Sequence, residues 1–174
     1  MRGKCCGFIS KGCIRARVRC TVNEFYDTFV NKFSTSIRRK DIFNSLIDFL
    51  KRINDKYKIY EVWIDGSYVS EKVNPNDVDI VIFFEVDDYI KIFPEWNVIR
   101  KVFNIDAYCA AAVNDASKKM LGTKEFNNIV NNRNYWRGQF GFDREDKPKG
   151  IVVFPIEEIE EYINGGDADG DASD

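Results

Sequence analysis

Two amphipathic helices are indicated in the first third of the chain. Thr21 and Glu24 have the spacing of a capping box, in which each side chain accepts a hydrogen bond from the other residue's backbone N–H. The apolar face of the helix that follows consists of Val22, Phe25, Tyr26, Phe29, Val30 and Phe33. After the polar break at 34–36, a second helix is predicted over 37–53, with a basic first turn at 36–40. Its inward residues are Ile42, Phe43, Leu46, Ile47, Phe49, Leu50 and Ile53.

The pattern then changes to that of strands, which are rich in Ile, Val, Phe and Tyr. Strands are predicted over 59–64, 77–86, 102–110 and 150–154, and helices over 88–93, 123–132 and 156–163. An edge strand is indicated over 13–20, where apolar residues alternate with arginines. The fold class predicted is α/β (α+β), a small mixed sheet of four or five strands with helices mainly on one face.

The length of 174 residues, 44% of them hydrophobic, is that of one domain with an ordinary core. We expect a basic arm over 1–20, a single domain over 21–163 and a disordered acidic tail over 164–174. The alternating acids Asp167, Asp169 and Asp171 resemble the start of a calcium loop, but no Glu follows at the twelfth position, which disfavours calcium.

Composition excludes several chemistries. The chain has no histidine, so imidazole-based triads and histidine-ligated metals are excluded. No apolar run approaches the roughly 20 residues of a membrane helix, and no signal peptide is visible, so we expect a cytoplasmic protein without membrane contact. Of the five cysteines, those at 5, 6, 13 and 20 lack the C-x2-C spacing of zinc sites, which favours reduced thiols over zinc. Cys109 is expected to be a buried apolar residue and not a nucleophile.

The candidate chemistry lies in one segment. A hydrophobic strand ends in Gly66 and Ser67, and nine residues later comes a strand with Asp77 and Asp79 on one face. Val78, Ile80 and Ile82 are expected to face the core. Gly66 would let the turn bring N–H groups close to phosphate oxygens, and Ser67 adds a hydroxyl donor.

A third acid, Asp106, lies on the next predicted strand. Three neighbouring carboxylates favour a hard cation such as Mg²⁺, with two ions possible. The competing interpretation is an ordinary turn whose acids face solvent.

This spacing resembles the signature of the polymerase-beta-like nucleotidyltransferase superfamily. The longer run over 63–69 and 75–79, with 140–144 and 148–151, is similar to a group of small, largely uncharacterised bacterial nucleotidyltransferase-like proteins. The resemblance implies that Gly66 and Ser67 bind an NTP, and that Asp77, Asp79 and Asp106 are the catalytic, metal-binding residues for Mg²⁺, with Mn²⁺ able to substitute.

The reaction implied transfers a nucleoside monophosphate to a hydroxyl on a protein or on RNA, including tRNA. The setting implied is a toxin–antitoxin or phage-defence module, with a cognate toxin or antitoxin protein as partner.

Two alternatives from other classes remain. One is a catalytically weak, antitoxin-like module that binds nucleotide. The other is an RNA-binding protein that uses the basic arm, although the net charge of -2 disfavours it. Within 134–150, Arg137, Arg144 and Lys149 are candidate phosphate contacts, and Tyr135 or Trp136 a stacking platform. The competing interpretation of this segment is a hairpin, with Phe140 and Phe142 pointing into the core.

Overall fold

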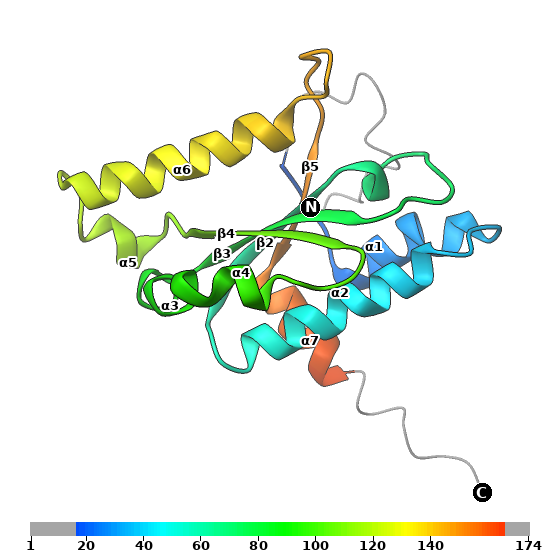
Figure 1. Ribbon diagram of the computed structural model, residues 1–174, viewed down its shortest axis with the longest axis horizontal. Helices are drawn as coiled ribbons and strands as arrows, with labels where there is room; N and C mark the ends of the chain where they lie inside the picture. The colour runs from blue at the N-terminus through cyan, green and yellow to red at the C-terminus, as the bar shows by residue number, and fades with distance from the viewer. Residues whose placement is uncertain (1–16, 166–174) are drawn as a thin grey trace, which may run out of the picture.

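The computed structural model describes residues 17–165, which form a five-stranded mixed sheet in the order β1-β5-β2-β3-β4 (Figure 1). The strands are β1 (Arg17–Arg19), β2 (Ile59–Asp65), β3 (Val78–Phe84), β4 (Ile105–Ala111) and β5 (Ile151–Pro155). Strand β2 is antiparallel to both β3 and β5, whereas β1 pairs with β5, and β3 with β4, in parallel. The expected α+β class is confirmed, and each strand predicted over 59–154 is present within a few residues.

The α-helices are α1 (Val22–Phe29), α2 (Arg39–Asn54), α3 (Val86–Ile92), α4 (Trp96–Ile99), α5 (Asp115–Lys118), α6 (Lys124–Gly141) and α7 (Ile156–Gly165). Short 3-10 helices are η1 (Asn31–Phe33), η2 (Ser67–Val69) and η3 (Phe93–Glu95). The capping box of α1 is confirmed, because Glu24 N donates to Thr21 Oγ1 and Thr21 N donates to Glu24 Oε2, each at 3.0 Å.

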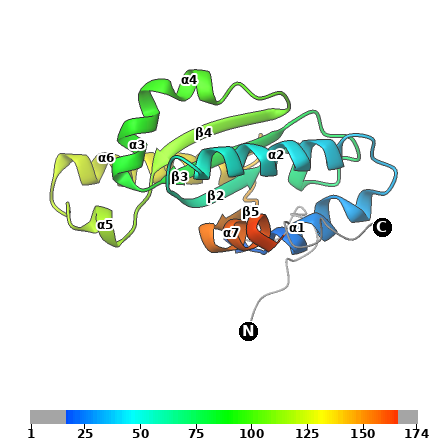
Figure 2. The same cartoon turned by 90° about the horizontal axis from the view of Figure 1, so that it is seen from below.

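Most helices cover one face of the sheet, here called the main face. There α1, α2 and α7 pack on inward side chains of the strands, such as Ile64, Ile82 and Phe154. Figure 1 shows these helices on one side of the sheet and α6 on the other, and in the view of Figure 2 α2 lies in front of the strands. The expectation of helices mainly on one face is therefore met, with α6 as the exception.

The opposite face, the α6 face, has a smaller core. Trp63, Val81 and Phe83 of the sheet contact Trp136 and Phe140 of α6. Arg133 of α6 lies over the Trp63 ring at 4.8 Å from its centroid. The α6 face therefore buries fewer side chains than the main face.

The segment over 134–150 differs from both the predicted helix end and the hairpin alternative. Helix α6 continues to Gly141, nine residues past the predicted end at 132, and hairpin character is limited to the turn at 143–147, which an isolated antiparallel bridge between Phe142 and Pro148 closes. Phe140 is buried as the hairpin alternative required, but Phe142 is 46% exposed. The helix persists because Trp136 and Phe140 pack on the sheet at helical spacing.

The boundaries at the chain ends change slightly. Asn164 and Gly165, expected in the tail, are the last residues of α7. The rest of the tail with its calcium-like acids, and the arm over 1–16 with the cysteines at 5, 6 and 13, lie outside the described residues. Between residues 17 and 165, no helix has the length and apolar character needed to cross a membrane.

Candidate functional site

The sheet register places three aspartates side by side. Asp65 at the end of β2 is opposite Asp79 on β3, and Asp79 is opposite Asp106 on β4. Asp79 has the same parity along β3 as Val81 and Phe83, so this row of acids is on the α6 face. Asp77 immediately precedes β3. We call Asp65, Asp77, Asp79 and Asp106 the acid row.

Electrostatic repulsion within the acid row acts mainly on Asp79. Burial, followed by the charges of Asp77, Asp65 and Asp106, raises the pKa of Asp79 to about 6. The nearby Lys149 ammonium partly opposes this rise. Asp79 is therefore the member of the row whose charge is least stable without a cation nearby.

The two flanking acids have polar partners of their own. Burial raises the pKa of Asp65, while Lys149 Nζ, which donates to Asp65 Oδ2 at 2.6 Å, opposes that rise. Asp106 Oδ2 accepts from the Tyr108 hydroxyl at 2.8 Å, and Asp106 Oδ1 is 3.8 Å from Arg100 Nη1. The flanking acids are thus held in place while Asp79 lies between them.

Gly66 is required where the turn meets the acid row. Its φ is +81°, in the region that side chains rarely adopt, and a Cβ at this position would be 1.8 Å from Asp79 Oδ2. The sequence had suggested that glycine allows phosphate oxygens to approach. The structure shows a contact within the protein itself: only glycine lets the turn and the Asp79 carboxylate pack together.

Arg39 fixes the loop that follows this turn. The guanidinium is buried, and it donates to the carbonyl oxygens of Tyr68, Ser70, Lys72 and Val73 in the loop and of Phe29 in α1. In return the Tyr68 hydroxyl donates to the Arg39 carbonyl at 2.6 Å. A residue that the sequence showed only as part of a basic first turn therefore positions the connection from Ser67 to Asp77.

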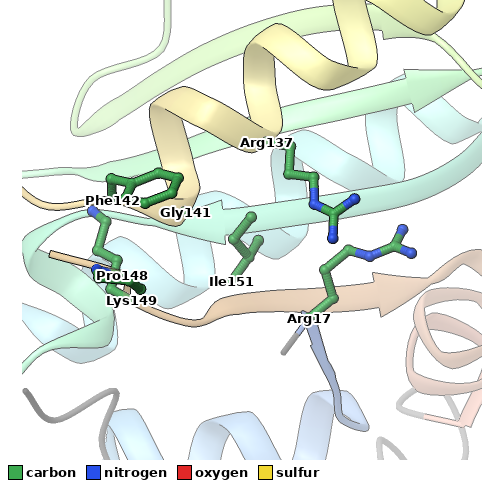
Figure 3. A pocket seen from close by; sticks show the side chains of 7 residues that line it. All are labelled: Arg17, Arg137, Gly141, Phe142, Pro148, Lys149 and Ile151. Carbon is green, nitrogen blue, oxygen red and sulfur yellow. The ribbon is translucent and has the colours of Figure 1, made fainter. Parts of the chain in front are cut away.

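Two cavities adjoin the acid row. The smaller, about 190 Å³, is lined by Asn76, Asp77, Asn104, Ile105 and Asp106. The larger, about 620 Å³, is lined by Arg17, Arg137, Gly141, Phe142, Pro148, Lys149 and Ile151 (Figure 3). We call the larger one the basic cavity. Lys149 lines it and also bonds to Asp65, so contacts run from the basic cavity along the acid row to the smaller cavity.

The candidate phosphate contacts and stacking residues separate in the structure. Lys149 and Arg137 line the basic cavity, whereas Arg144 is exposed on the turn at 143–147 and does not line it. Trp136 packs on Tyr108, with ring centroids 4.6 Å apart, and is therefore part of the α6 interface. Tyr135 is 56% exposed.

The donor chemistry of the acid row fits a hard divalent cation, because carboxylate oxygens are the ligands that Mg²⁺ prefers. Within the described part of the chain, however, no three His, Cys, Asp or Glu side chains converge closely enough to hold a metal ion. The carboxylates would have to turn toward one another to share an ion. Cys109 is buried, which raises its pKa to about 12, as expected for a cysteine that acts as an apolar residue.

Sequence reasoning missed Asp65 and Arg17 as site residues. The signal for Asp65 was present, since it directly precedes Gly66 at the end of a predicted strand. Its partners Asp79 and Lys149 are 14 and 84 residues away, and only the sheet register brings them together. Arg17 was expected in the basic arm and in the edge strand predicted over 13–20; it does lie in β1, but its place in the wall of the basic cavity was not foreseen.

Comparison with known proteins gives one match. No curated protein and no solved structure matches the chain. A family model described as "Family of unknown function (DUF6932)" matches residues 7–155, a range that contains the acid row and both cavities.

Proposed function

The chain belongs to this family of unknown function, and from its residues we propose that it is a Mg²⁺-dependent nucleotidyltransferase. In the proposed reaction a hydroxyl oxygen of a protein or RNA acceptor, such as tRNA, attacks the α-phosphorus of an NTP. The bond from that phosphorus to the pyrophosphate oxygen breaks, pyrophosphate leaves, and the proton of the acceptor hydroxyl would pass to a carboxylate of the acid row. The observation that carries the proposal is the Asp79 carboxylate, packed against the Gly66 turn and flanked in register by Asp65 and Asp106.

Each part of the acid row has a proposed role. Asp77, Asp79 and Asp106 would hold one or two Mg²⁺ ions, with Mn²⁺ as a substitute. The ions would neutralise charge on the phosphates. The raised pKa of Asp79 supports this assignment, because a group that is costly to ionise alone gains most from a cation.

The nucleotide contacts follow from the same placement. Gly66 and Ser67 would bind phosphate oxygens through the turn that Arg39 holds in place. Lys149 would neutralise a phosphate beside Asp65. Arg144 would contact a phosphate from the exposed turn at 143–147. We place the reaction in the cytoplasm, where NTPs and Mg²⁺ are abundant, within a toxin–antitoxin or phage-defence module.

One observation favours a second candidate function, a nucleotide-binding module without turnover that acts with a cognate toxin or antitoxin protein. The acid side chains do not converge on a single point in the described residues. A module that binds nucleotide but cannot gather its metal ions would bind an NTP and release no pyrophosphate.

Labelling separates the two functions. The protein is incubated with each labelled NTP, Mg²⁺ and either total tRNA or lysate, and labelled macromolecule and pyrophosphate are measured. We expect Asp77→Asn/Asp79→Asn to lower labelling about a hundredfold or more. Asp48→Asn, at an exposed position on α2, is the matched control and should label as wild type does. Nucleotide binding by calorimetry without label from any NTP would reject the transferase and favour the binding module.

A further inference from the structure

We infer that the basic cavity binds a phosphate-bearing nucleoside unit, which is the acceptor of the proposed transfer. The role of this unit as acceptor rests on the proposed function, whereas its binding in the cavity does not. The cavity is formed by three segments that are far apart in sequence: β1, the C-terminal end of α6, and the residues just before β5. The fold therefore brings side chains from three distant segments around one cavity.

Positive charge in the basic cavity exceeds the negative charge available to it. Figure 3 shows the guanidinium groups of Arg17 and Arg137 extending into the same space from β1 and α6. Glu61 is 4.0 Å from Arg17, but the same carboxylate oxygen is 2.7 Å from Arg133. Burial, and then the charge of Arg133, lower the pKa of Arg17, and Arg137 adds to this repulsion. A phosphate between two guanidinium groups would relieve it and accept two or more charge-assisted hydrogen bonds.

The remainder of the cavity suits a planar ring. Phe142 and Pro148 lie toward the other end, with Ile151 between that end and the arginines (Figure 3). Phe142 is 46% exposed as a residue, although it lines a cavity. A volume of about 620 Å³ is far larger than one phosphate needs and is within the range of small-molecule sites. Stacking of a base on Phe142 would use this space.

The position of the basic cavity relative to the acid row indicates why a ligand would bind there. Lys149 contributes to the cavity wall and bonds to Asp65, which is the register neighbour of Asp79. A nucleoside with its phosphate on Arg17 and Arg137 would thus have its other end toward Lys149 and the acids. This is where a hydroxyl would have to lie to attack a nucleotide held at the Gly66 turn.

Two sources could supply such a unit, a free mononucleotide or the end of an RNA strand. Calorimetry on the full chain with AMP and with a 5′-phosphorylated RNA trinucleotide distinguishes them. Binding of both probes identifies the mononucleotide unit as sufficient, and binding of the trinucleotide alone identifies an RNA end. Failure of wild type to bind either probe overturns the inference.

Variants locate the binding. Arg17→Gln/Arg137→Gln should weaken the affinity for the bound probe tenfold or more, whereas Lys51→Gln/Arg52→Gln, which removes the same charge from the exposed surface of α2, should change it less than twofold. A smaller effect of the cavity pair overturns the inference. If thermal melts show that the pair is unfolded, Arg137→Gln alone, at an exposed position, provides the same test with a threshold of threefold.

Asp77→Asn separates this inference from the proposed function. The variant should lose transfer and keep its affinity for the probe. Probe binding that depends on the cavity arginines, with no transfer from any NTP in wild type, would reject the transferase and leave the cavity assignment in place. Transfer by wild type, with an acceptor KM that Arg17→Gln/Arg137→Gln leaves unchanged, would support the transferase and overturn the assignment of the cavity as the acceptor site.

Discussion

Each face of the sheet has an arginine packed against it, Arg39 fully buried and Arg133 with 17% of its side chain exposed, and the two are stabilised in different ways. On the main face, Arg39 donates five hydrogen bonds to backbone carbonyls and also lies 3.7 Å from the centroid of the Phe33 ring. On the α6 face, Arg133 lies over two aromatic rings and forms an ion pair with Glu61, but its Nη1 is buried without a hydrogen bond. The first arginine has its donors satisfied and the second does not.

This difference extends beyond the arginines. Of the five buried side-chain polar atoms without a hydrogen bond in residues 17–165, four are on the α6 face, in Glu61, Trp63, Arg133 and Trp136. Glu61 Oε1 is within ion-pair distance of Arg133 but lacks hydrogen-bond alignment. The acid row and the basic cavity are on this same face. The main face thus has the larger buried core, whereas the α6 face, beside the acid row and the basic cavity, contains most of the buried polar atoms without a partner.

The largest effect is expected when the main-face arginine is removed. Arg39→Met deprives five carbonyl oxygens of their donor and should lower the free energy of unfolding by about 3–5 kcal/mol. A thermal melt should show a decrease in Tm of about 6–20 °C. Lys40→Met, an exposed neighbour on α2, is the control and should stay within about 0.5 kcal/mol. Equal effects of the two variants would contradict the contrast between the faces.

Glycine substitutions should have opposite signs at two positions. Gly66→Ala places a Cβ 1.8 Å from Asp79 Oδ2 at a φ of +81°, so it should lower stability by about 2–3 kcal/mol and displace the carboxylate. Gly138→Ala, within α6 and with open space around its Cβ, should raise stability by about 0.5–1 kcal/mol. Urea unfolding measures both changes in stability. A loss of stability in Gly138→Ala would show that a Cβ at this position of α6 meets a neighbouring group and contradict the open space around it.

The α6-face ion pair should be replaceable, unlike Arg39. Arg133→Met alone leaves Glu61 buried with only Arg17 nearby, at 4.0 Å, and should lower stability by about 2 kcal/mol. Glu61→Met/Arg133→Met should return to within about 1 kcal/mol of wild type, because a buried pair is often no more stabilising than apolar side chains. A double variant as unstable as the single one in urea would mean that the pair itself stabilises this face.

The smallest effect concerns the charge of Asp79 in metal-free buffer. Because the pKa of Asp79 is raised from 3.8 to about 6 in the folded chain, the folded chain binds this proton more tightly, and its ionisation lowers stability as pH rises through that window. Asp79→Asn should therefore be more stable than wild type at pH 7, by about 1 kcal/mol after solvent screening, and equal to it below about pH 4. Urea unfolding at several pH values, with Asp48→Asn as control, measures this. A gain that does not depend on pH would exclude the charge as its cause.

The sequence predicts elements well where local patterns determine them. The capping box at Thr21, the apolar spacing of α1 and α2, and the β-branched strands depend on neighbours a few residues apart. The end of α6 could not be predicted in this way, because Tyr135, Gly138 and Gly141 are weak helix formers. The helix continues through them because Trp136 and Phe140 pack on the sheet.

The candidate site divides along the same line. The spacing of Gly66, Asp77 and Asp79 is visible in the sequence, and so is the strand that carries Asp106. The burial of Arg39 is not visible, because its acceptors are carbonyls spread from Phe29 to Val73 and no acid marks the position. The basic cavity could not be foreseen either, since it requires β1 and β5 to pair at Arg17 and Ile151, which are 134 positions apart.

The position of β5 in the sheet affects how the chain folds while it is being synthesised on the ribosome. Strand β5 lies between β1 and β2, yet it is the last strand to be synthesised. Until residues 151–155 emerge, β2 has an unpaired edge and β1 lacks its partner. Strands β2, β3 and β4 can pair earlier, so the acid row would form on a nascent sheet in which the edge of β2 is still unpaired and prone to associate with other chains. Stalled or truncated chains that end before residue 151 should therefore aggregate through the exposed edge of β2.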